Sequence, residues 1–292
     1  MMAVGISGAA VSPAMGKFKI GPARALLALM NVRVGVWVPN PKYVAAWRPG
    51  EPDTRDRPSR PGHVPYPQPR LGYLLKEAFG VHDPDDLYLY VTDGGHWENT
   101  GLVELLRDRN FSEVVCLDAD AGDRDTVTQL ANAVILGELE CGVNISVDLD
   151  PLRSALGARR GGDYAKRSVT LGLIRRGDRR GLLWYSKPAL TVGTPPDVLS
   201  YGENDTSFPT TSTVDQFFHT AKFSAYRDLG RYNARQVIAA RAAVKTALEA
   251  APTWPEFETR AAAPDAHWAV VTLHGLVTGD YEYSQLREQL TV

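Results

Sequence analysis

The sequence has few cysteines, almost no net charge and no long apolar run, and each absence excludes a class of protein. Two cysteines among 292 residues cannot form a disulfide framework or a zinc site with four cysteine ligands. The 32 Lys and Arg residues nearly balance 34 Asp and Glu, so no basic excess favours nucleic-acid binding. No stretch supplies the roughly 18 uncharged apolar residues of a membrane-spanning helix. What is present, including 44% apolar residues, is the composition of a globular protein.

The N-terminal segment lacks a targeting signal. Residues 1–13 contain no basic residue and run directly into Gly, Ser and Pro. Together with the scarcity of cysteine, this favours a cytoplasmic protein, with association to a membrane surface left open. Gly5–Ala10 has the small and apolar residues of a packed core segment, so we expect further residues to precede Met1 in the intact protein.

Beyond a proline-rich region, apolar runs alternate between helical and strand patterns. Residues 39–69 hold nine of the twenty prolines, which predicts a surface loop over 39–70, because proline fixes φ and removes a backbone donor. Helical and strand-like segments then alternate over residues 71–79, 87–91, 101–109, 114–117, 126–139 and 143–147. We therefore predict an α/β fold with a largely parallel sheet flanked by helices, in which Val91 and Val115 lie on adjacent or near-adjacent parallel strands.

The pattern changes after residue 165. Residues 168–174 and 181–185 flank a charged turn and predict an added β-hairpin. Nine residues between 153 and 180 are basic and two are acidic, which favours a solvated hairpin tip, with contact to an anionic membrane surface as the alternative. A helical C-terminal region should follow: an irregular loop over 191–215, helices over 215–232 and 234–250, a linker over 250–266, and a peripheral strand and helix over 268–290. The predicted domain is residues 1–250, and residues 251–292 form a linker and peripheral extension.

Among the residues that carry chemistry, Asp93 has the clearest position. It follows a strand-like run and precedes Gly94 and Gly95. A carboxylate at the C-terminal end of a buried parallel strand stands where α/β folds bind ligands, and the glycines permit a sharp turn and close approach. The alternative is structural, with Asp93 capping the next helix or closing a turn. For His96, and for Asp118 and Asp120 after the next strand, the structural interpretation is preferred, and no histidine has metal-ligand spacing.

Three segments in the same order resemble the patatin-like and cytosolic phospholipase A2-like acyl hydrolases, particularly bacterial members. Asp93–Asn99 has the form D-G-G-x-x-x-N. Ile6–Pro13 is similar to a small-residue segment, S-A-A-x-P in general form, that precedes the D-G-G loop. Phe208–Phe218 is similar to a segment of the bacterial members. The resemblance covers roughly residues 3–230.

The resemblance implies a lipid acyl ester hydrolase, phospholipase-like or lysophospholipase-like, that uses a Ser-Asp dyad. Asp93 would be the dyad base, and the residues that shape the substrate site would be Gly94, Gly95, Asn99 and Gly8. A serine attacks the acyl carbonyl, Asp93 takes its proton, and water then releases the acyl group. The implied partner is a lipid or acyl ester substrate, and neither a metal nor an organic cofactor is implied.

The sequence departs from this family at the nucleophile. The family's serine elbow, G-x-S-x-G, and its oxyanion loop both lie ahead of the small-residue segment, which here begins at residue 6. Gly5–Ala9 imitates the elbow and makes Ser7 a weak candidate nucleophile, because too few residues precede it to form the strand that an elbow ends. We therefore expect residues 1–250 to be the C-terminal part of the hydrolase domain, inactive alone. The alternatives are a non-catalytic lipid-binding or scaffold protein, and an unrelated α/β binding module in which Asp93 is structural.

Overall fold

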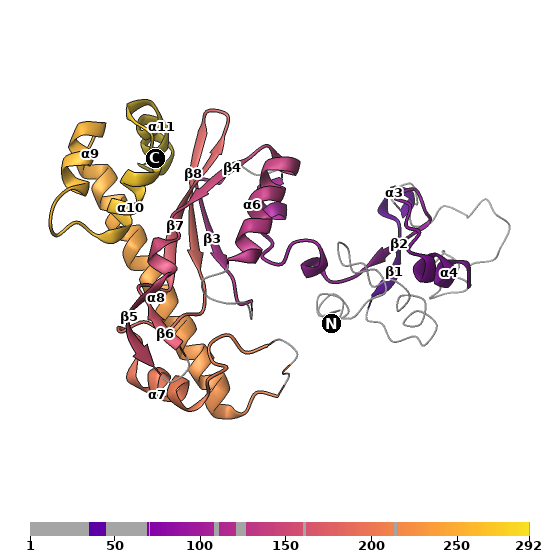
Figure 1. Ribbon diagram of the computed structural model, residues 1–292. Coiled ribbons are helices and arrows are strands. Elements are labelled where there is room, and N and C mark those ends of the chain that lie inside the picture. The colour runs from indigo at the N-terminus through magenta and orange to yellow at the C-terminus, as the bar shows by residue number, and fades with distance from the viewer. Residues whose placement is uncertain are drawn as a thin grey trace, which may run out of the picture. The chain divides into compact units, whose positions relative to one another are not determined.

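The computed structural model describes residues 35–44, 69, 71–107, 111–120, 127–159, 162–212, 215 and 217–291. These residues belong to two compact units, which divide the chain between Asn99 and Thr100 and are described separately. Figure 1 labels their helices and strands. Most of the predicted proline-rich loop lies outside the described residues.

The first unit contains a two-stranded antiparallel sheet. Strand β1 (Val36–Pro39) pairs with β2 (Tyr88–Val91). The short helix α3 (Pro41–Val44) follows β1, so the surface loop predicted over 39–70 is wrong at its first residues. Helix α4 (Leu71–Phe79) precedes β2. The predicted helix over 71–79 is therefore confirmed, as is the strand predicted within 87–91.

Aromatic side chains hold this unit together around one buried carboxylate. The ring of Trp37 on β1 lies 4.9 Å from that of Tyr73 on α4 and 5.1 Å from that of Tyr90 on β2. The indole N–H of Trp37 donates to the carboxylate of Glu77, which is fully buried, at 3.2 Å. A buried carboxylate requires such donors, so this contact ties α4 to the sheet.

The predicted pairing of the strands that contain Val91 and Val115 is wrong. Val91 is the register partner of Val36 in the antiparallel sheet of the first unit. Val115 lies on β3 (Glu113–Leu117), in a different sheet of the second unit, where its register partner is Trp184. No strand was predicted ahead of residue 87, so β1, the strand that pairs with β2, was missed.

The second unit is built on a four-stranded mixed sheet in the order β3, β8, β7, β4. Strand β8 (Arg179–Ser186) pairs in parallel with β3. Strand β7 (Val169–Arg176) is antiparallel to both β8 and β4 (Asn144–Val147). Consequently β3, β8 and β4 run in one direction and β7 in the other. An α/β fold is confirmed, but the expectation of a largely parallel sheet is not.

The hairpin predicted after residue 165 is confirmed, but it forms the centre of the sheet rather than an addition to it. Residues 171–174 and 181–186 are buried without alternation, the pattern of strands covered on both faces. Gly172 permits a close approach at this position, because a Cβ there would lie 2.9 Å from the Ser146 carbonyl oxygen on β4. The turn itself uses Gly177, whose φ is 53°.

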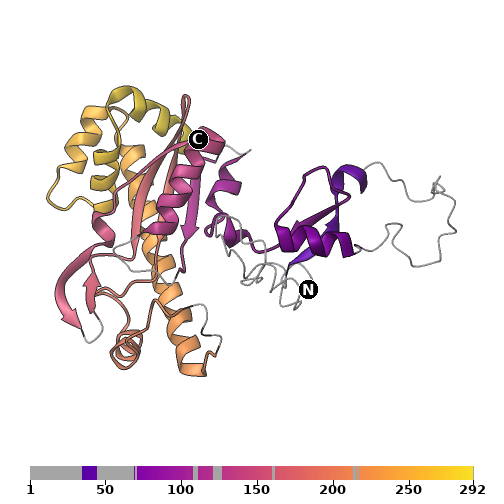
Figure 2. The same ribbon diagram turned by 45° about the vertical axis from the view of Figure 1, so that its right-hand side comes forward.

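Helices cover both faces of this sheet, as Figures 1 and 2 show. On one face lie α5 (Leu102–Arg107) and α6 (Thr128–Cys141), which share a core with the buried side chains of β3, including Val114 and Cys116. On the other face, α8 (Thr220–Ala250) and the C-terminal helices pack on a second core. Its members include Val169, Leu171, Leu173, Leu182, Trp184, Val237, Ala240 and Val244.

Residues 251–292 were predicted to form a linker and a peripheral extension, and this prediction is wrong because many of them belong to this core. Helix α9 (Trp254–Ala261) lies within 250–266, and its Phe257 is fully buried. The predicted final strand and helix are two helices, α10 (Trp268–Leu276) and α11 (Asp280–Thr291). Proline explains the error at α9. Pro255 lies in the first turn of the helix, where a backbone N–H has no partner within the helix, so its absence costs nothing.

Three further corrections concern residues 150–250. Helix α7 (Pro196–Asn204), which also begins with proline, lies within the predicted irregular loop. The two helices predicted over 215–250 are the single helix α8. Strands β5 (Ser154–Arg159) and β6 (Gly162–Ala165), which follow the 3-10 turn η2 (Asp150–Leu152), pair as a small antiparallel sheet. Across the described ranges, no helix combines the length and the apolar character needed to cross a membrane.

Candidate functional site

Asp93 stands two residues beyond the end of β2, where it caps the 3-10 turn η1 (Gly94–His96). Its carboxylate oxygen Oδ1 accepts a hydrogen bond of 2.9 Å from the backbone N–H of Gly95. The other oxygen, Oδ2, accepts no hydrogen bond within the described part of the chain. The capping interpretation of Asp93 is therefore correct, whereas its expected position at the end of a parallel strand is wrong, because β2 pairs antiparallel with β1.

The D-G-G-x-x-x-N spacing brings Asn99 back to the same turn. A Cβ built on Gly95 would lie 2.6 Å from Oδ1 of Asn99 and 3.3 Å from Oδ1 of Asp93. A side chain at position 95 would therefore require the exposed Asn99 side chain to move. At Gly94 a Cβ would meet nothing within 4 Å, so the space around Gly94 does not require a glycine.

The structure thus brings together Asp93, Gly95 and Asn99 from the predicted site. Ser7 and Gly8 lie outside the described residues, as does the side chain of His96. The expected approach of Asp93 to the segment around Ser7 therefore stays a prediction.

The acids after β3 belong to the second unit and have a structural role. Asp118 is buried and accepts a hydrogen bond of 2.5 Å from the hydroxyl of Tyr185 on β8. Burial and this hydrogen bond raise the pKa of Tyr185 well above its ordinary value. Asp118 also accepts from the backbone N–H of Asp120 at 2.9 Å, which closes the turn after the strand. Of the preferred interpretation, solvation and turn formation, the turn is therefore confirmed, whereas solvation is wrong for the buried Asp118.

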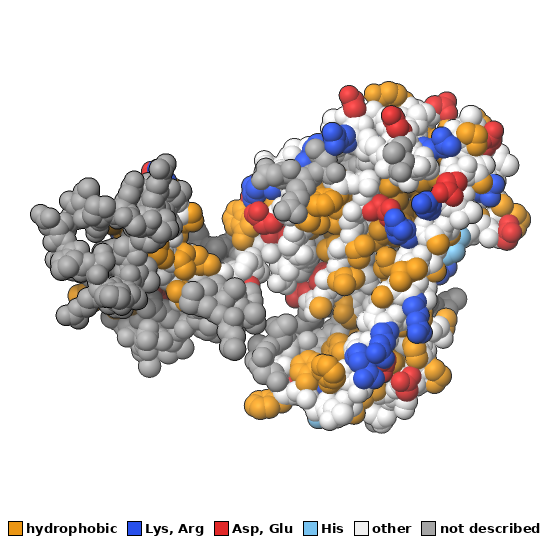
Figure 3. Space-filling view, turned by 180° about the vertical axis from the view of Figure 1, so that it is seen from behind, with side chains coloured by type: hydrophobic (Ala, Val, Ile, Leu, Met, Phe, Trp, Pro, Cys, Tyr) orange, Lys and Arg blue, Asp and Glu red, His pale blue; other side chains and the backbone are white. Residues whose placement is uncertain are grey.

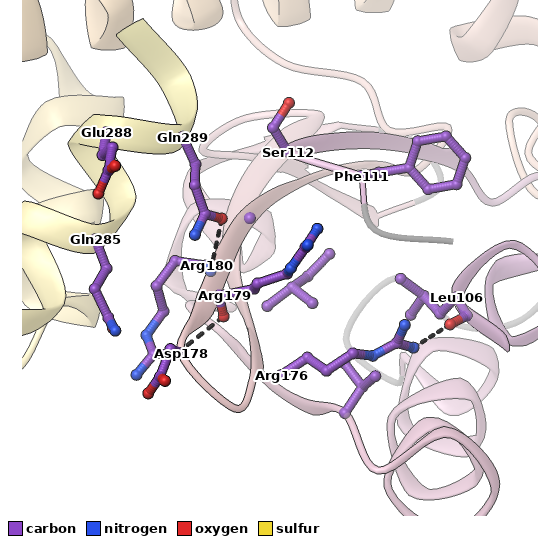
Figure 4. A pocket seen from close by; sticks show the side chains of 13 residues that line it. Leu106, Phe111, Ser112, Arg176, Asp178, Arg179, Arg180, Gln285, Glu288 and Gln289 are labelled. Carbon is purple, nitrogen blue, oxygen red and sulfur yellow. Dashed lines mark hydrogen bonds between the residues drawn. The ribbon is translucent and has the colours of Figure 1, made fainter. Parts of the chain in front are cut away.

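A cavity of about 600 Å³ lies in the second unit at the tip of the β7–β8 hairpin. Figure 4 shows the arginines of the hairpin on its lining, with side chains of α11 beside them. Its buried floor is formed by Leu106, Val143 and Ile174. The charged turn could be predicted from the sequence, but this cavity could not. The α11 side chains follow the turn by about a hundred residues, and no short-range spacing connects the two segments.

The hairpin arginines are largely engaged within the protein. Arg175 and Arg180 both donate to the buried carboxylate of Glu282 on α11, with Nε–Oε1 distances of 2.6 and 2.8 Å. Burial alone would raise the pKa of Glu282, but the hydrogen bonds from Arg175 and Thr278 outweigh it and lower the pKa to about 2. Arg176 donates to the backbone carbonyl of Leu106. Most of this predicted basic region therefore has internal partners.

A second basic surface lies on the outward side of α8. Arg227, Arg231 and Arg235 are exposed one helical turn apart, and the exposed side chains of Phe223 and Ile238 lie on the same helix. Seen from behind in Figure 3, Lys and Arg side chains gather with apolar ones on this side of the second unit. Basic side chains with apolar neighbours on one exposed helix are typical of contact with an anionic lipid surface.

The described residues of the two units do not offer the grouping of side chains that a metal would require. Among the described residues, no three His, Cys, Asp or Glu side chains are placed to hold an ion together. The chemistry that the Asp93 turn offers is that of a general base with one hydrogen-bonded and one available oxygen. No protein-family model matches the chain, and no match is found among curated proteins or solved structures.

Proposed function

We propose that this chain supplies the aspartate half of a Ser-Asp dyad in a lipid acyl ester hydrolase of the patatin-like and cytosolic phospholipase A2-like type. The observation that supports it is the geometry of Asp93. One oxygen is fixed by the N–H of Gly95, so the carboxylate has a defined orientation, while Oδ2 has no hydrogen-bond donor among the described residues. A general base needs this combination of orientation and availability.

In the proposed reaction, Asp93 acts twice on protons. It first accepts the proton of a serine hydroxyl that attacks the acyl carbonyl, and the alcohol leaves. It then activates a water molecule that releases the acyl group from the serine. Gly95 contributes its N–H to hold the carboxylate, and a side-chain oxygen of Asn99 lies beside the same glycine. With this function we also expect a larger, mainly parallel sheet that includes β3, β8 and β4, the strands that run in one direction.

Access to a lipid substrate requires contact with a membrane surface, and α8 offers a suitable one. The side chain of Arg235 forms no hydrogen bond or ion pair with a described residue, whereas Arg227 and Arg231 both pair with Asp228. Phe223 and Ile238 are 60% and 66% exposed, enough to reach the headgroup region while the arginines stay at the polar boundary. The proposed protein therefore works at the cytoplasmic surface of an anionic membrane.

The alternative is a lipid-binding or scaffold protein with the same fold and no catalysis. It is favoured by the sequence G-I-S-G-A at residues 5–9, which lacks the final glycine of the serine elbow. Both functions use the same lipid surface, so membrane binding does not separate them. Only hydrolysis does.

The test is ester hydrolysis by the natural protein expressed in full from its genomic reading frame. Asp93→Asn keeps an oxygen that accepts from Gly95 but removes the charge, so kcat should fall by about 10²–10⁴. Asp83→Asn is a matched control, because Asp83 also accepts a backbone N–H two residues later, from Asp85 at 2.9 Å. Equal rates for the wild-type protein and the Asp93→Asn variant would favour the scaffold alternative.

A further inference from the structure

Strand β3 forms one edge of the four-stranded sheet, and only β8 pairs with it among the described strands. On the β8 side, the carbonyl of Ser112 accepts a backbone hydrogen bond and the N–H of Asp118 donates one, each of 2.9 Å. Successive residues of a strand point their backbone groups to opposite sides. Glu113, Val115 and Leu117 therefore direct their N–H and C=O groups toward the outer edge, where another strand can pair with them.

Exposed apolar side chains accompany these backbone groups. Val115 and Leu117 are 52% and 69% exposed, although each neighbours a buried residue of the same strand. They lie on the α8 face of the sheet together with Glu113, which accepts from the indole of Trp184 at 3.0 Å and from Arg241 of α8 at 2.7 Å. Strand β3 contains no lysine, proline or bulge, the features by which edge strands avoid pairing, and its one charge is already paired.

The opposite edge of the sheet, strand β4, lacks this combination. Its exposed residue is Asn144, whereas Ile145 is buried and Ser146 and Val147 are partly buried. The hydroxyl of Ser146 also accepts a hydrogen bond of 2.7 Å from Arg175 on β7. An outer edge with exposed apolar side chains is therefore a feature of β3 and not of the sheet as a whole.

We propose that β3 pairs antiparallel with β3 of a second copy of this chain, about a twofold axis that passes by Cys116 and stands perpendicular to the sheet. In this register Val115 lies opposite Leu117 of the second copy, and the axis repeats the pair. Both residues direct their backbone groups outward, so each pair exchanges N–H···O=C hydrogen bonds between the copies. The contact uses the same surface of each copy, as a twofold interface does, and joins the two sheets into one.

Charge and spacing favour a second copy as the occupant of this edge. The two exposed apolar residues stand symmetrically about Cys116, so β3 matches its own reverse. Glu113 keeps its ion pair with Arg241 and comes to lie opposite Ala119, so no like charges are opposed. An in-register parallel pairing would instead bring Glu113 of the two copies together. The proposal does not depend on Asp93.

The first test is sedimentation velocity of the full chain over a range of concentrations, which should show a monomer that converts to a dimer. Leu117→Lys places a charge in the apolar pair and should raise the dissociation constant of the dimer about tenfold or more. Leu139→Lys is the matched control, because Leu139 on α6 is 76% exposed, and it should dimerise like the wild-type protein. Thermal unfolding shows that both variants keep the fold. A monomer at every concentration, or an equal effect of the two substitutions, would overturn the proposal.

Hydrogen exchange resolved to single amides tests the strand pairing itself. The N–H groups of Val114 and Cys116 point to β8 and should be protected at every concentration, whereas those of Val115 and Leu117 should become protected only as the dimer forms. Leu117→Lys should remove the protection of Val115 at a concentration where the wild-type protein is dimeric. Equal protection of Val115 in monomer and dimer would show that a strand of the same chain covers the edge, and no protection in the dimer would place the contact elsewhere. Either result overturns the proposal.

Discussion

Arg175 and Glu282 are 107 residues apart in the sequence and are joined by two hydrogen bonds, of 2.6 and 3.1 Å. The Glu282 carboxylate also accepts from Arg180 and from the backbone and hydroxyl of Thr278. With so many donors around one buried carboxylate, this contact fastens α11 to the central hairpin. A buried carboxylate stabilises the fold only while its hydrogen-bond donors remain in place.

Glu282→Gln should therefore lower the free energy of unfolding by about 3 kcal/mol at neutral pH. This is the stabilisation that corresponds to a carboxyl pKa of about 2 in the folded protein instead of the ordinary 4.5. Because the folded pKa is lowered, the stabilisation is present above about pH 4.5 and is lost as the pH falls toward 2. Urea unfolding of the two proteins should converge over that range. Glu288→Gln, on the same helix but exposed, should change little. Parallel pH profiles for the wild-type and Glu282→Gln proteins would contradict this account.

Gly95 and Gly94 should respond differently to alanine. Gly95→Ala places a methyl group against the Asn99 and Asp93 oxygens and should cost about 1 kcal/mol, since the contact forces Asn99 to move. Gly94→Ala meets open space and should leave the turn intact. Hydrogen exchange of peptides over residues 88–100 measures both effects. Adding Asn99→Ala to Gly95→Ala should recover part of the loss, and strict additivity of the two substitutions would argue against a direct contact.

Much of the fold could be predicted from local pattern, and the errors have a physical cause. Short strands and the helices of 71–147 follow from apolar spacing, and the 168–185 hairpin follows from its turn. The pairing of strands depends on contacts between distant residues, such as Val36 with Val91, which spacing does not encode. Proline caused a second error, because Pro196 and Pro255 lie in the first turns of helices where the sequence suggested a loop or linker.

The functional candidates also divide into residues that short-range spacing predicts and residues that only packing brings together. Asp93, Gly95 and Asn99 lie within seven residues, so their proximity could be predicted from the D-G-G-x-x-x-N spacing. The cavity at the hairpin tip could not, because Arg179 and Gln285 come from distant segments that only the packing of α11 brings together. Charge composition was also misleading, since most of the basic residues of the hairpin have partners within the protein.

Two glycines of the second unit should have opposite effects on stability when they are changed to alanine. Gly230 lies inside α8 with nothing near its Cβ position, so Gly230→Ala should stabilise the protein by about 1 kcal/mol through the better helix propensity of alanine. Gly172→Ala should destabilise it by about 1–3 kcal/mol, because the methyl group would meet the Ser146 carbonyl at 2.9 Å. Urea denaturation measures both. A stabilising Gly172→Ala would show that the sheet has more room than described.

The α8 surface should bind anionic vesicles through its basic side chains. Arg235→Glu should weaken binding to vesicles containing phosphatidylglycerol by about tenfold, since each basic residue near such a surface contributes about 1 kcal/mol. Arg260→Glu makes the same charge change on α9 and should have a smaller effect. Flotation with these vesicles, and with phosphatidylcholine vesicles as a reference, measures the difference. An equal effect of the two substitutions would point to net charge rather than to α8.

The most direct test of the central claim is the rate at which a fluorophosphonate probe labels the natural protein expressed in full. Such a probe reacts with a serine whose proton a neighbouring base removes. We predict that one serine is labelled, and that Asp93→Asn slows labelling by about 10²–10⁴ while Asp83→Asn leaves the rate unchanged. Peptide mapping then identifies that serine and tests Ser7 directly. Absence of labelling, or the same rate with and without the Asp93 carboxylate, would contradict the assignment of Asp93 as the base of a Ser-Asp dyad.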